Sequence, residues 1–276
     1  MTSSPRRTAW LLFAVSLALR VAFATEMAGT PLYRHADWRD TDNRFFRDWA
    51  SAIADGDWLG EQPNHPYHGW HAWMASQWAH AHGAEDTEAA GRLLWDGWYG
   101  GARFHQEPLY PYLLAVTKLA MGDVRFVFIL QALAGAASTL LAWAIGRRLA
   151  GDRAGLLAAA LHLSYGPFVY HDFLLHRTSL QTFGGLLVVW LIQRVWERRR
   201  TLDFAQLGGA LGASILLVST TILVLLAVAG AAVASWRKAA LRPVAVMVAA
   251  ALLVISPAVA RNVAVGVSPF ALSSVG

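Results

Sequence analysis

Two short polar stretches carry the residue types that group-transfer chemistry needs. DTDNRFFRDWASAIADGDWLG opens with Asp40 and Asp42, and a carboxylate at the head of such a stretch could serve as a general base or as a metal ligand. RFHQEPLYPYLL places His105, Gln106 and Glu107 directly before an apolar segment. We interpret the second stretch either as a capped loop or as a second polar wall of the cleft that Asp42 would line.

A third candidate lies near the end of the chain. In SPAVARN, Arg261 and Asn262 follow an apolar run. A guanidinium can hold a phosphate through two parallel hydrogen bonds, so we expect these residues to contact a donor phosphate. The alternative is that Arg261 anchors the chain at the membrane interface.

Each remaining polar signal has a plainer alternative. Asp42 could be only a helix N-cap that accepts a backbone N–H. Asp172 and Arg177 fit a solvated loop between two apolar runs. The sequence also holds a histidine-rich stretch, but it has neither cysteine nor an H-E-x-x-H motif, so a zinc site is only weakly indicated. Its histidines are His65, His68, His71, His80 and His82.

The composition predicts a membrane protein. The chain is 56% hydrophobic and only 15% charged, whereas about a quarter of the residues in a soluble domain are charged. Several runs approach the roughly 20 apolar residues that cross a bilayer. The absence of cysteine excludes disulfides and thiolate chemistry.

The distribution of charge predicts the orientation. Acidic residues outnumber basic ones in 26–121, whereas short basic clusters separate the apolar runs and mark the cytoplasmic side. The net charge of +5 is therefore no sign of nucleic-acid binding. The clusters are Arg6-Arg7, Arg147-Arg148 with Arg153, Arg198-Arg199-Arg200, and Arg237-Lys238 with Arg242.

These patterns predict an all-α polytopic protein with about seven transmembrane helices and a cytoplasmic N-terminus. The first run is interpreted as an uncleaved anchor, although AFA at its end resembles a signal-peptidase site. The stretch 204–236 is interpreted as a short hairpin that turns near Ser219, Thr220 and Thr221. The expected spans lie near 10–24, 123–146, 154–172, 178–195, the two arms of 204–236, and 243–259.

We expect one domain over 1–276, in which 26–121 is a long external loop and 122–276 a bundle that is incomplete at its C-terminus. Apolar residues recur at helical spacing at Phe45, Phe46, Trp49 and Ile53, which predicts an amphipathic helix lying on the membrane surface. A second interfacial helix is expected to begin at Pro108.

Taken together, DNRFFRDWASAIADGDWLG, QEPLYPYLLA, GRRLAGDRAGLLAAAL and SPAVARN resemble the GT-C integral membrane glycosyltransferases of the family 39 type. That group includes protein O-mannosyltransferases, lipid A aminoarabinose transferases and bacterial relatives that often carry tetratricopeptide repeats. The resemblance implies a polyprenyl-phosphate sugar donor and a protein, lipid or glycan acceptor. It also implies transfer with inversion outside the cytoplasmic membrane of a bacterium, with Asp42 as the essential acid.

The sequence departs from this family in several places. Many relatives have Asp-Glu where this chain has Asp42-Asn43, which leaves open whether Asp42 holds a divalent cation. Gln106 stands where the aminoarabinose transferases have Glu, and the insert 61–105 is long. Many relatives have a basic residue where the hairpin reads VSTT. Relatives also continue past Arg261 with more spans, so we expect a C-terminally truncated chain.

Two other classes of function remain open from the sequence. A transporter or flippase for lipid-linked sugars would place charged residues inside its spans and broken helices at mid-membrane, whereas here the only clear charge within an expected span is Arg20 and the carboxylates crowd one external loop. A non-catalytic membrane partner would fit the truncation and the missing second acid.

Overall fold

The computed structural model describes residues 4–38, 41–61, 69–85 and 87–274, and these residues form helices without any strand. The protein is an all-α membrane protein. The helices are α1 Pro5–Ala28, α2 Asp42–Ala54, α3 Gly69–Ala81, α4 Thr87–Tyr99, α5 Leu109–Met121, α6 Val127–Ser164, α7 Gly166–His171, α8 Thr178–Arg198, α9 Thr201–Ile215, α10 Ile222–Trp236 and α11 Leu241–Ala264. Short 3-10 turns are η1 Pro31–Asp37, η2 Val124–Phe126, η3 Ser219–Thr221 and η4 Arg237–Ala240.

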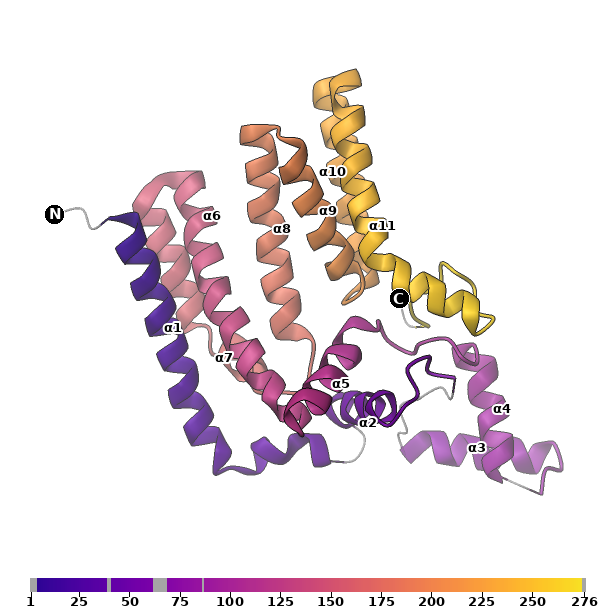
Figure 1. Ribbon diagram of the computed structural model, residues 1–276. Helices are drawn as coiled ribbons and strands as arrows, with labels where there is room; N and C mark the ends of the chain where they lie inside the picture. The colour runs from indigo at the N-terminus through magenta and orange to yellow at the C-terminus, as the bar shows by residue number, and fades with distance from the viewer. Residues whose placement is uncertain (1–3, 39–40, 62–68, 86, 275–276) are drawn as a thin grey trace.

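The long helices stand side by side, and the helices of the first loop gather at one end of them. In Figure 1, α1, α6, α8, α9, α10 and α11 are upright, and α2 to α5 lie at their lower end. The turn within α6 and the α8–α9 and α10–α11 links lie at the opposite end. These three links carry basic clusters, so the fold separates them from the acidic loop as the charge pattern predicts.

Three stretches are long and apolar enough to cross a membrane: Pro5–Ala28, Val124–Ser164 and Ser219–Ala264. The second contains a sharp turn, because Ala150 and Gly151 leave the helical conformation and Gly151 has φ +85°. Figure 1 shows the two arms of α6 running beside each other. Gly146 and Gly155 permit this approach, since a Cβ at either would lie within 3 Å of a backbone oxygen of the other arm. The number of spans remains a prediction.

The span expected near 154–172 is divided in the structure. The second arm of α6 ends at Ser164 rather than near residue 172, and the separate short helix α7 begins at Gly166, with Pro167 in its first turn. Proline cannot donate a backbone hydrogen bond, and it disfavours helical geometry in the residue before it, so the chain breaks here. The hairpin expected in 204–236 is confirmed, with its turn at Ser219–Thr221.

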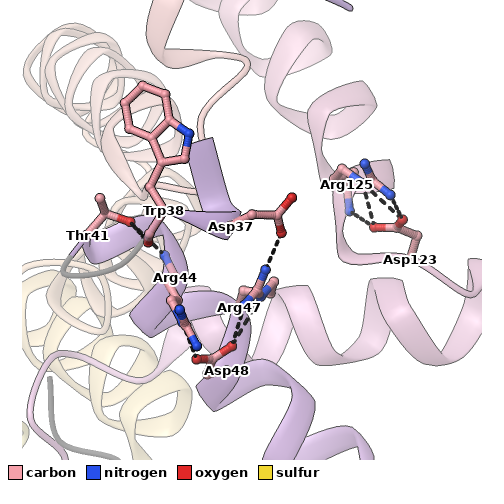
Figure 2. A network of polar contacts seen from close by, with 8 residues as sticks. All are labelled: Asp37, Trp38, Thr41, Arg44, Arg47, Asp48, Asp123 and Arg125. Carbon is pink, nitrogen blue, oxygen red and sulfur yellow. Dashed lines mark hydrogen bonds and ion pairs between the residues drawn. The ribbon is translucent and has the colours of Figure 1, made fainter. Parts of the chain in front are cut away.

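The helix predicted at residues 42–54 forms, but its apolar face does not lie against the membrane. Phe46 and Ile53 are completely buried in a cluster with Tyr110 and Leu114 of α5. The apolar face of α2, which the sequence pattern predicts to contact lipid headgroups, is therefore buried against α5. The polar face of α2 then points outward, where Figure 2 shows Arg47 bridging Asp37 and Asp48.

The orientation can be tested by labelling, because the chain has no cysteine of its own. Single cysteines at Ser76 on α3 and at Arg198 at the end of α8, both exposed, should react with a membrane-impermeant thiol reagent from opposite sides. The positive-inside distribution requires Ser76→Cys to react in intact cells and Arg198→Cys only after permeabilisation. Reaction of both from one side would contradict the topology.

Candidate functional site

Asp42 occupies the first turn of α2, but it does not cap the helix. Thr41 is the N-cap, and its hydroxyl accepts a hydrogen bond from the backbone N–H of Arg44 at 3.3 Å. The side chain of Asp42 is 51% exposed, and its Oδ2 lies 3.8 Å from Nε2 of His176. The capping interpretation of Asp42 is therefore wrong, and its carboxylate is directed to the loop between α7 and α8.

Glu107 forms the second polar centre of the site. Its carboxylate is buried, accepts the backbone N–H of Ser219 at 2.9 Å and pairs with Arg177. Burial alone would raise the pKa of Glu107, but the Ser219 N–H and the charge of Arg177 outweigh it, so the pKa lies below its usual value. Glu107 is thus a fixed anion and cannot readily act as a proton donor.

The sequence suggests that Asp172 and Arg177 lie in a solvated loop. In the structure, both side chains of this loop after α7 are paired instead. Asp172 is buried and pairs with Arg20 of α1 at 2.6 Å, while Arg177 pairs with Glu107. The intervening His176 packs its ring against Phe46. This loop therefore joins Asp42 on one side to Glu107 on the other.

The loop is fixed by a buried glutamine. Gln131 of α6 is fully buried and donates through Nε2 to the carbonyls of Asp172 and Leu174, both at 2.9 Å. Its Oε1 accepts a hydrogen bond from the hydroxyl of Tyr110 at 2.7 Å. Gln131 therefore connects α5, α6 and the loop that presents His176 and Arg177.

The other residues of the second stretch have separate surroundings. The His105 ring is buried against Phe45 and Tyr99, at 5.4 and 4.9 Å between ring centroids, whereas Gln106 is half-buried. Of the three, it is Glu107 whose contacts lead to the loop after α7. Asp40 lies outside the described residues.

Arg261 holds the far side of the first loop, whereas Asn262 holds the segment that follows α11. The Arg261 guanidinium donates to the carbonyls of Leu59 and Gly60, at 2.5 and 2.8 Å, and lies over the ring of Phe104. Asn262 donates to the carbonyl of Ala271 at 2.8 Å. These contacts give Arg261 an anchoring role, and its contact with a donor phosphate remains a prediction.

Among the described residues around Asp42, the donor set does not fit a metal cage built by the protein. The neighbouring Asn43 directs its amide to Nδ1 of His35, at 2.8 Å, and Glu107 is engaged by Arg177. Across the described part of the chain, no three side chains of His, Asp or Glu converge. His65 and His68 of the histidine-rich stretch lie outside that part, so their metal binding remains untested.

Comparison with known families adds the chemistry. The family model described as dolichyl-phosphate-mannose-protein mannosyltransferase matches residues 105–260. The chain belongs to this family. It is thus a membrane glycosyltransferase of the GT-C type, as the motifs predicted. Neither the curated proteins nor the solved structures contain a match.

The family match begins at the second stretch, so it includes Glu107, Gln131 and Arg177 but not α2. The assignment of Asp42 therefore depends on its position in the structure. Neither the contact of His176 with Asp42 nor the role of Gln131 at the site is evident from the sequence. The signal that the sequence offers is HDFLLHR, a polar loop between two apolar runs, whose partners lie between 40 and 152 positions away.

Replacing Gln131 should displace the loop. Gln131→Met keeps the size but leaves the carbonyls of Asp172 and Leu174 without a donor, which should cost about 1–3 kcal/mol of unfolding free energy. Cysteines introduced at Asp42 and His176 should then form a disulfide more slowly than in the unmodified background. Gln77→Met, at an exposed position of α3, is the control. An unchanged rate of disulfide formation would show that Gln131 does not position the loop.

Proposed function

We propose that this protein transfers a sugar from a polyprenyl-phosphate donor to an acceptor hydroxyl on the outer side of a bacterial cytoplasmic membrane. The observation that carries this proposal is the exposed carboxylate of Asp42 beside His176, at the end of the bundle that holds the acidic loop. A lipid-linked donor keeps its phosphate at the interface, so a site for it belongs at such an end. The family supports a lipid-linked sugar and an acceptor in a membrane.

The chemistry follows from the charges around Asp42. The acceptor hydroxyl attacks the anomeric carbon of the sugar and gives its proton to the carboxylate of Asp42, while the bond to the phosphate oxygen breaks with inversion. The imidazole of His176, 3.8 Å from the carboxylate, orients it. The leaving polyprenyl phosphate carries the electron pair of the broken bond, and Arg261 or another cation neutralises it.

The second polar wall has a structural part in this scheme. The pair formed by Glu107 and Arg177 ties the loop to the turn at Ser219. It keeps His176 facing α2 while the donor and the acceptor exchange. The sugar and the acceptor are not specified by these residues.

The proposal is tested at Asp42. Asp42→Asn removes the basicity but keeps the helix, because Thr41 supplies the cap. Transfer from a synthetic polyprenyl-phosphate mannose to the membrane fraction should fall roughly 10²–10⁴-fold, as for a positioned proton acceptor. Asp55→Asn, an exposed acid at the other end of α2, should transfer at the parental rate.

Near-parental transfer by Asp42→Asn would refute its role as base. If the parent protein transfers no label from this donor and does not bind it, the non-catalytic partner becomes the better description. Export of a lipid-linked sugar without transfer would instead favour a flippase.

The phosphate role of Arg261 needs a separate test. Arg261→Lys keeps the charge but replaces a two-pronged donor by a point charge, so the Kd for the polyprenyl-phosphate sugar should rise about tenfold. Arg153→Lys, at the opposite end of the bundle, is the control and should bind as the parent does. Unchanged affinity together with a lower melting temperature would assign Arg261 to anchoring alone.

A further inference from the structure

A large apolar groove lies between α1 and α6, apart from the site around Asp42. Its volume is about 680 Å³, within the range of ligand pockets. Its walls include Leu17, Val21, Ala24, Ile129, Ala132 and Leu133. Val21 and Ile129 are more than half exposed, and both helices are apolar enough to cross the membrane. The groove is therefore open toward the hydrocarbon of the bilayer, and its apolar lining matches a lipid chain.

One end of the groove carries a pair of opposite charges. Asp123 and Arg125 both line the groove, and the Oδ2 of Asp123 lies 2.6 Å from the Nη2 of Arg125. The side chain of Asp123 is 35% exposed and that of Arg125 is 43% exposed. The guanidinium of Arg125 also lies 5.4 Å from the ring centroid of Tyr33, a residue type common at the headgroup level. Figure 2 draws this pair and, separately from it, the network of Asp37, Arg47 and Asp48; the pair lies just before α6. Among the described residues that line the groove, its mouth thus offers one cation and one anion.

We propose that this groove binds one zwitterionic aminophospholipid of the bilayer. An acyl chain lies between α1 and α6, the lipid phosphate meets Arg125 and the ammonium group meets Asp123. A purely anionic headgroup would place its charge beside the Asp123 carboxylate with no ammonium to offset it. This charge pattern favours a phosphoethanolamine headgroup over a glycerol headgroup or a polyprenyl phosphate. The inference is independent of the proposed function.

The experiment is native mass spectrometry of the full chain, offered equal amounts of phosphatidylethanolamine and phosphatidylglycerol with identical acyl chains. The parent should retain one phosphatidylethanolamine with about a fivefold preference, as expected for one additional interfacial charge contact. Asp123→Asn keeps the cap that Asp123 gives to Arg125, because asparagine and aspartate cap comparably. That variant should lose the preference.

Two tryptophan substitutions on α6 separate the groove from the general lipid shell. Leu133 lines the groove, whereas Leu130 does not, and both are exposed by around two fifths. Leu133→Trp should lose the retained lipid, whereas Leu130→Trp should keep it. Equal retention of the two phospholipids by the parent, or equal behaviour of the two variants, would overturn the proposal. Displacement of phosphatidylethanolamine by a polyprenyl phosphate would assign the groove to that lipid instead.

Discussion

The buried pair of Arg20 and Asp172 is the contact on which the arrangement of the site depends. An arginine in the middle of an apolar helix is costly unless its charge is matched, and here the match comes from a residue 152 positions away. The first span is thereby joined to the loop after α7. Gly135 of α6 faces the pair, where a Cβ would lie within 2.5 Å of Asp172 Oδ2 and of Arg20 Nε. A side chain there would separate the two charges.

From this pair the constraint passes to the site. Gln131 lies one helical turn before Gly135 and holds the carbonyls of the same loop. With the loop fixed at Asp172 and Leu174, His176 reaches Asp42 and Arg177 reaches Glu107. The polar groups of the site are thus supported by residues inside the bundle, although the reaction proposed for them takes place at its end.

The packing of α2 on α5 completes the arrangement. Phe46 is buried beside Tyr110 and His176, so the aromatic face of α2 is used for contacts within the protein. This packing fixes the rotation of the helix and leaves Asp42 half exposed. Arg261 holds the segment that follows α2, through the carbonyls of Leu59 and Gly60. A fixed position of Asp42 suits the proposed reaction, because its carboxylate must stay in place while the donor and the acceptor exchange.

The sequence by itself determined the all-α membrane architecture, a helix through Phe45 and Ile53, a second helix from about Pro108, the hairpin with its turn at Ser219–Thr221, and the family. The architecture, the helices and the hairpin follow from local periodicity and apolar length, and the family from the resemblance of the motifs, none of which needs knowledge of distant contacts. Only the tertiary structure decided that Thr41 rather than Asp42 caps α2, that the face of Phe46 packs on α5, and that Asp172 and Arg177 are paired. The physical reason is that a buried charge is paired, and an apolar face is covered, by whichever group the fold places next to it. Those partners, such as Arg20 for Asp172, are far away in the sequence.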